Sequence, residues 1–125
     1  MAELISAPTR IPVPGGKVID EYVGRVTTGT EAVSVAHMVA PGGWSEPAQQ
    51  PEFDEVTVVL RGLVRVEVTD GDGSTRTVDV PAGQAVVTKA GERVRYSTGD
   101  EETEYVAVCL PAFSPDIVNR DPEPA

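Results

Sequence analysis

The chain has 125 residues and a formal net charge of −10, from 20 acidic and 10 basic residues. This length is enough for one domain that buries a single core. Because a strongly acidic surface repels phosphate backbones, we expect no nucleic-acid partner. The sequence has no run of about 18 apolar residues, which predicts that it does not span a membrane.

The start of the chain and its cysteine content indicate where the protein works. The first 16 residues lack a basic region followed by an apolar run, so we expect no signal peptide. The single cysteine, Cys109, excludes an internal disulfide and favours a reducing compartment. These features predict a cytoplasmic protein. Cys109 itself is either a nucleophile or a buried structural thiol, and no nearby cation favours the first reading.

Short β-rich runs alternate with turn signals between two irregular ends of the chain. Residues 1–16 have no clear period and predict an N-terminal arm, 17–113 predict a barrel, and 114–125 predict a polar tail. Strands are predicted at 19–27, 32–39, 55–60, 63–69, 75–80, 84–88, 93–97 and 103–110. The clearest hairpin turns at 70–73, where Asp and Gly tolerate positive φ. Eight short strands without a helical period predict an all-β sandwich or barrel with little helix.

Two spacings anchored by glycines carry a family resemblance. Gly43, Glu55 and Gly62 form the first, and Gly83 and Gly91 form the second. Together they resemble the two motifs of the cupin superfamily, whose members are small jelly-roll β-barrels. The resemblance covers roughly residues 30–120 and implies a cupin-type jelly-roll fold. It also implies a homodimer, since family members often associate in pairs.

The departures from the cupin motifs concern the metal ligands. Family members usually hold a metal with three histidines and one glutamate. Gln49 and Pro51, or Ala48 and Gln50 if the longer gap of the motif is used, stand at the first two histidine positions. Val94 stands at the third, and only Glu55 is kept. Because imidazole nitrogen supplies much of the affinity for transition metals, we expect no metal and no cofactor. A residual metal site made of Glu55, Gln49 and the chain's one histidine, His37, is a further alternative.

Strand alternation predicts which side chains face the inside of the barrel. If Glu55 points inward, residues two and four positions away on the same strand point inward as well. The second motif places Val94, Tyr96 and Thr98 inside by the same rule. The predicted substrate-binding residues are Gln49, Phe53, Thr57, Trp44, Val94, Thr98 and Tyr105. An apolar interior with a few polar groups is typical of a small-molecule pocket.

Glu55, Tyr96 and His37 are the predicted catalytic residues. Burial of Glu55 in an apolar barrel should raise its pKa, which suits general acid or base work near neutral pH. Alternatively, Glu55 pairs with an arginine such as Arg61, Arg93 or Arg95 and has only a structural role. Tyr96 is either a proton donor to substrate or a barrel-filling aromatic residue. His37 becomes a partner of Glu55 only if it faces inward.

Two functions are compatible with these residues. The first is a metal-independent enzyme that moves a proton on a carbonyl-bearing small molecule, by isomerisation, dehydration, epimerisation or cyclisation. The resemblance to small bacterial cupins places such a reaction in secondary metabolism. The second is a cupin that binds a small molecule without catalysis, as a sensor or a carrier. An ionisable group in the pocket distinguishes them, because only the enzyme needs one.

Overall fold

The computed structural model describes residues 2–122, which form nine strands and one short helix. The strands are β1 (Thr9–Ile11), β2 (Val18–Val23), β3 (Ser34–Ala40), β4 (Asp54–Arg61), β5 (Leu63–Thr69), β6 (Thr75–Pro81), β7 (Ala85–Thr88), β8 (Arg93–Thr98) and β9 (Thr103–Leu110), and the helix is α1 (Pro115–Val118). The prediction of an all-β fold with little helix is confirmed.

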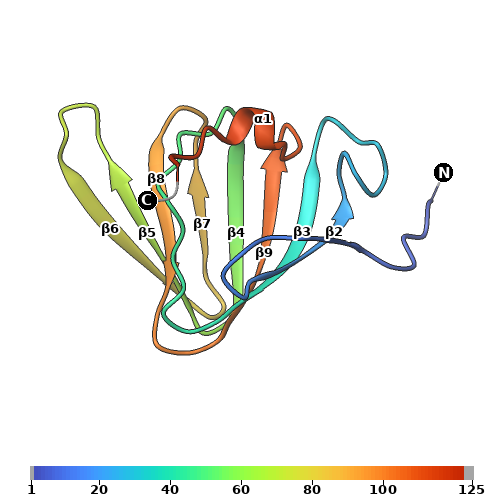
Figure 1. The fold of residues 1–125 in the computed structure, drawn as a ribbon, viewed down its shortest axis with the longest axis horizontal. Helices are drawn as coiled ribbons and strands as arrows, with labels where there is room; N and C mark the ends of the chain where they lie inside the picture. Colours follow the sequence, from blue (N-terminus) through green and yellow to red (C-terminus); the bar gives the residue numbers. More distant parts are fainter. Residues whose placement is uncertain (1, 123–125) are drawn as a thin grey trace.

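The strands make two antiparallel sheets (Figure 1). The larger sheet has the order β1-β2-β3-β9-β4-β7, and the smaller has the order β6-β5-β8. Gly62 is the single residue between β4 and β5, so the chain passes there from the larger sheet to the smaller. Two strands that are distant in sequence, β3 and β9, lie side by side in the larger sheet.

The core lies between the sheets because each strand alternates buried and exposed residues. In β5, Val64, Val66 and Val68 are buried, and the residues between them face solvent. They pack in one cluster with Val59 of β4 and Tyr105 of β9, which come from the other sheet. This period of two is what a strand with one buried face requires.

The hairpin between β5 and β6 forms at the predicted turn. The Ser74 amide donates to the Asp72 carboxylate (2.9 Å), and the Asp70 amide donates to the Ser74 carbonyl (2.8 Å). Gly73 has a φ of +86°, a conformation that glycine adopts without steric cost. Local chemistry therefore fixes the register of this hairpin.

Both ends of the described chain are more ordered than the sequence predicts. Strand β1 lies inside the predicted arm 1–16 and pairs with β2, and the ion pair between Arg10 and Asp20 (3.0 Å) joins the two strands. Helix α1 lies inside the predicted tail 114–125, whose last three residues are outside the described range. The Ser114 hydroxyl caps this helix by accepting from the Asp116 amide (3.2 Å). At four residues, α1 is too short to cross a membrane, and no other helix occurs among residues 2–122.

Candidate functional site

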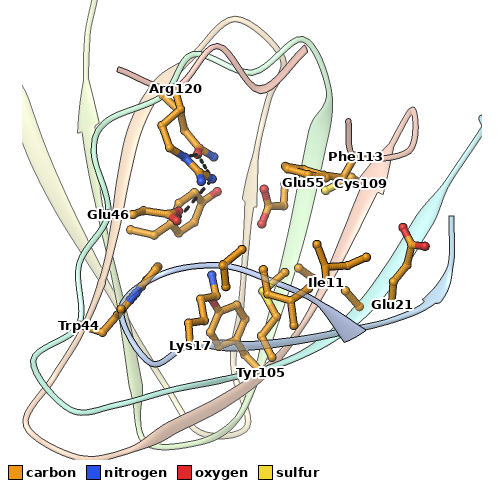
Figure 2. A pocket seen from close by; sticks show the side chains of 18 of the residues that line it. Ile11, Lys17, Glu21, Trp44, Glu46, Glu55, Tyr105, Cys109, Phe113 and Arg120 are labelled. Atoms are coloured by element: carbon orange, nitrogen blue, oxygen red, sulfur yellow. Dashed lines mark hydrogen bonds and ion pairs between the residues drawn. The ribbon is translucent and has the colours of Figure 1, made fainter. Parts of the chain in front are cut away.

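A cavity of about 400 Å³ lies against the inner face of the larger sheet. Its size falls in the range usual for ligand pockets, about 300–1,000 Å³. Residues of the N-terminal segment, the loop before β4, β8 and β9 all contribute to its walls. The lining residues that can carry charge or a proton are Lys17, Glu21, Glu46, Glu55, Tyr96, Tyr105, Cys109 and Arg120. Figure 2 shows Glu55, Lys17 and Arg120 turned toward the same space.

Glu55 carries the most perturbed carboxyl group of the cavity. Burial raises its pKa from 4.5 to about 7, and the Glu46 carboxylate adds to this effect. Lys17, a long hydrogen bond from Thr57 (3.5 Å) and Arg120 oppose the rise. The Glu55 side chain is half-buried at the cavity wall, and desolvation there outweighs the opposing contacts. Glu55 therefore changes its protonation state close to neutral pH.

None of the three arginines considered as structural partners reaches Glu55. Arg61 pairs with Glu102 (2.8 Å), Arg93 pairs with Asp121, and Arg95 donates to the Glu46 carbonyl (3.3 Å). These contacts therefore do not support the alternative in which Glu55 forms a structural ion pair with one of these arginines.

The raised pKa of Glu55 predicts how stability depends on pH. The folded state favours the protonated carboxyl, so this contribution to stability is complete below about pH 4.5 and is lost as the pH rises through about 7. The loss amounts to about 3 kcal/mol at most, because one pKa unit corresponds to roughly 1.4 kcal/mol. Urea unfolding from pH 4.5 to 8.5, for the wild type and Glu55→Gln, measures it. The variant should lack this fall, and parallel curves for the two proteins would contradict the assignment.

A polar cluster forms the wall of the cavity opposite Glu55. Arg120 donates to the Gln49 side-chain oxygen through Nε (3.1 Å) and Nη2 (2.9 Å) and lies 3.4 Å from Glu46 Oε2. These bonds fix the guanidinium at the cavity rim (Figure 2). With Glu55 protonated, the charged side chains that line the cavity are two cations, Lys17 and Arg120, and two carboxylates, Glu21 and Glu46.

Three further titratable side chains of the cavity, two tyrosines and a cysteine, are held in their neutral forms. Burial raises the pKa of Tyr96 and of Tyr105 well above the usual range, and nearby carboxylates add to the effect. The Tyr96 hydroxyl shares a hydrogen bond with Thr88 (3.0 Å). Burial and Glu55 likewise raise the pKa of the Cys109 thiol, which disfavours the reactive thiolate. Tyr96 can therefore donate a hydrogen bond, whereas Cys109 behaves as a buried thiol.

Several predicted site residues line the cavity. Gln49, Trp44, Tyr96 and Tyr105 do so, together with Glu55. The first cupin motif located Glu55 and Trp44, and strand alternation from the second motif located Tyr96.

Four predicted binding residues lie elsewhere. Thr57, Val94 and Thr98 are buried as strand alternation predicts, but they fill the core and do not line the cavity. Thr98 donates to the Pro41 carbonyl (2.7 Å), which supports the loop that carries Trp44. Phe53 packs against Phe113, with ring centroids 5.9 Å apart, because the segment after β9 folds across the end of β4. The structure therefore does not place these four side chains at the cavity.

His37 lies on the other face of the larger sheet. Its neighbours Ala36 and Met38 line the cavity, so alternation along β3 points His37 away from it. The His37 Nε2 atom is 2.9 Å from Glu104 Oε1. The prediction that His37 acts with Glu55 is therefore wrong, and so is a metal site that uses both residues.

Sequence reasoning missed four charged residues of the cavity. Lys17 begins the predicted barrel, Glu21 lies on the predicted strand 19–27, Glu46 belongs to the loop before β4, and Arg120 lies in the predicted tail. None of them stands at a motif position, so no local signal marks them. Among residues 2–122, no group of three or more His, Cys, Asp or Glu side chains is placed to hold a metal ion.

Comparisons with known proteins give one sequence relative and many structural ones. The chain is 45% identical over 116 residues to a Myxococcus xanthus protein named endoribonuclease YbeY. This match covers 91% of the chain but only 38% of the relative, so the chain spans well under half of that protein's length. No protein-family model matches the chain.

Several solved structures that resemble the chain are variants and forms of Bacillus subtilis oxalate decarboxylase. The W96Y variant superposes with a TM-score of 0.79 and 19% identity, over 93% of this chain and 31% of that one. The same enzyme at pH 4.6 gives a TM-score of 0.77 and 20% identity, over 90% of this chain and 30% of that one. At such low identity, these neighbours establish the fold alone.

The sequence relative corrects the predicted function and partners. A protein named for cutting RNA contradicts an isomerase, lyase or cyclase of secondary metabolism, and it equally contradicts a small-molecule sensor or carrier. It also contradicts the absence of a nucleic-acid partner. The charge argument averaged over the whole surface, and it could not show the cations that the fold gathers at one cavity. The homodimer stays a prediction.

The two motif spacings, the sheet order and the superpositions agree with one another. The all-β architecture and the TM-scores near 0.8 together show that this chain has the cupin fold.

Proposed function

We propose that this chain acts on RNA, holding one nucleotide of a strand in the cavity and using Glu55 as the proton acceptor for cleavage of the adjoining phosphodiester. The observation that carries the proposal is a carboxyl group with a pKa of about 7 in a cavity that also contains Lys17 and Arg120. The name of the 45% identical relative supports RNA as the substrate. The chain matches only 38% of that relative, and it is part of the proposal that the matched part carries the cleavage activity.

The proposed reaction needs one proton acceptor and one positive charge. The Glu55 carboxylate takes the proton of a ribose 2′-hydroxyl while the 2′-oxygen forms a bond to phosphorus. The bond from phosphorus to the 5′-oxygen then breaks, and the leaving oxygen takes a proton from water. Arg120 stabilises the charge that develops on the phosphoryl oxygens. A base with a pKa near the working pH is the most effective for such a step.

The acidity of the chain limits how RNA can bind. With a net charge of −10, most of the surface repels a phosphate backbone. The apolar walls of the cavity, which include Trp44 and Ile11, suit one desolvated base and not a long stretch of strand. The proposal is therefore for a site that takes a single nucleotide out of the strand.

This arrangement predicts a weak salt dependence of RNA binding. Of the cations among residues 2–122, only Lys17 and Arg120 line the cavity, and each phosphate contact on single-stranded nucleic acid contributes a slope of about −0.7. Affinity should then fall by less than about tenfold between 50 mM and 200 mM salt. Fluorescence anisotropy with a labelled oligoribonucleotide measures this fall. A loss of about a thousandfold would instead indicate a broad basic surface and would contradict the proposal.

Cleavage is tested with two matched oligonucleotides. One is all RNA, and the other has a deoxyribose at every position, which removes the attacking 2′-hydroxyl. We expect cleavage of the RNA only, with 2′,3′-cyclic phosphate ends detected by mass spectrometry. Cleavage of both strands, or of neither, would refute the proposed reaction.

A further inference from the structure

Lys17 occupies an unusual position for a charged side chain. It lines the cavity, and its Nζ atom lies 4.2 Å from the centre of the Trp44 ring and 5.4 Å from that of Tyr105 (Figure 2). Among residues 2–122, no carboxylate oxygen comes within 4.0 Å of this nitrogen to form an ion pair. The amine is therefore held by aromatic faces and not by a salt bridge.

The charges around Lys17 do not cancel the lowering of its pKa by burial. Desolvation lowers the pKa of its amine, and Arg120 acts in the same direction, while Glu46 and Glu55 oppose the shift less strongly. A larger share of the amine is then uncharged near neutral pH than for a lysine in water. A desolvated lysine beside another cation is the usual setting for an amine that attacks carbonyl carbon.

Glu55 supplies the second group that such chemistry needs. Lys17 and Glu55 line one cavity and lie close enough for each to shift the pKa of the other. A carboxyl group that titrates near pH 7 can give a proton to a departing hydroxyl and take it back afterwards. The cavity thus pairs a nucleophilic nitrogen with a proton donor.

We infer that Lys17 is a site of covalent capture, whose amine forms an imine with the C1′ aldehyde of a ribose in RNA that has lost its base. This inference rests on the proposed function for its substrate class, because the C1′ aldehyde is the carbonyl that an RNA strand exposes when a base is lost.

The proposed step is balanced without any oxidant or reductant. The lone pair of Lys17 Nζ forms a bond to C1′, and the carbonyl oxygen becomes a hydroxyl after a proton moves to it from nitrogen. The C1′–O bond then breaks, and the hydroxyl leaves as water with a proton from the Glu55 carboxyl. The product is a protonated imine beside the Glu55 carboxylate, so charge is conserved.

The experiment traps this imine by reduction. The protein is mixed with a synthetic oligoribonucleotide that contains one abasic ribose, sodium cyanoborohydride is added, and the modified residue is located by peptide mass spectrometry. The chain has two lysines, Lys17 and the exposed Lys89, so each sample contains its own control. We expect at least a tenfold preference for Lys17 over Lys89 in the wild-type protein.

Matched variants sharpen the result. Lys17→Arg keeps the charge but removes the nucleophile and should abolish the adduct, whereas Lys89→Arg should leave it unchanged. Equal labelling of both lysines, labelling only at the N-terminal amine, or a persistent adduct in Lys17→Arg would overturn the inference. The lysine preference of the wild type decides the question even if Lys17→Arg fails to fold.

Two further arms separate this inference from the proposed function. If intact RNA is cleaved but the abasic strand leaves no adduct on Lys17, the inference fails and the proposed function stands. If the abasic strand is trapped on Lys17 but intact RNA is not cleaved, the proposed cleavage fails and the covalent site stands. Labelling of Lys17 by propanal but not by the abasic strand overturns RNA as the source of the aldehyde.

Discussion

The Glu55→Gln variant should lose RNA cleavage by about 10²- to 10⁴-fold, the usual contribution of a general base. The substitution keeps the shape of the side chain but removes the group that accepts the proton. Since the folded protein already favours the uncharged form of Glu55, the neutral amide should not disturb the fold. The measurement is the cleavage rate of the all-RNA oligonucleotide as a function of pH. In the wild type, the rate should rise with an apparent pKa near 7 and then level off.

A matched control for this variant is Glu67→Gln. Glu67 is an exposed glutamate on the outer side of β5 and does not line the cavity. The Glu67→Gln variant should cleave RNA at the wild-type rate with the same pH profile. Full activity in a folded Glu55→Gln protein would contradict the assignment of Glu55 as the base. A pH profile of this variant identical to that of the wild type would contradict it as well.

The second large effect concerns stability and the passage from β4 to β5. Gly62 has a φ of +81°, and a methyl group there would lie 2.4 Å from Thr103 Oγ1 and 2.8 Å from the Glu102 carbonyl oxygen. The second of these is a backbone atom that cannot turn aside. We expect Gly62→Ala to lower the free energy of unfolding by about 3–5 kcal/mol, the sum of a strained backbone and overpacking. Urea denaturation at neutral pH measures the loss.

Gly83→Ala separates the two causes. Gly83 has a similar φ of +85°, but a methyl group there would meet no atom within 4 Å. This variant should lose only the cost of the left-handed backbone, about 1–2 kcal/mol. Equal losses in both variants would mean that the contacts with Thr103 and Glu102 relax freely, contrary to the prediction.

Strand alternation predicted the buried face of the barrel from the sequence. Glu55, Thr57 and Val59 all point inward, and so does the set that begins at Val94. This succeeded because the period of a strand is two, so one residue of known direction fixes its neighbours. The rule does not separate inward residues that line a cavity from those that fill the core, which is why Thr57 was assigned a binding role that it lacks.

Residues outside the predicted strands could not be placed in this way. Lys17, Glu46 and Arg120 reach the cavity from three segments that are far apart in the chain. His37 lies on a strand, but no motif position fixed its direction, and the pairing of β3 with β9 turned it outward toward Glu104. Long-range packing decided each of these positions.

The amino-acid order alone determined a β-rich fold and the hairpin at 70–73, because local periodicity and turn chemistry act over a few residues. The resemblance to the cupin motifs implied the cupin fold and the inward carboxyl group of Glu55. Only the tertiary structure decided which charges surround that carboxyl. Its pKa depends on the burial and the positions of Glu46, Lys17 and Arg120, and those are set by contacts between distant parts of the chain.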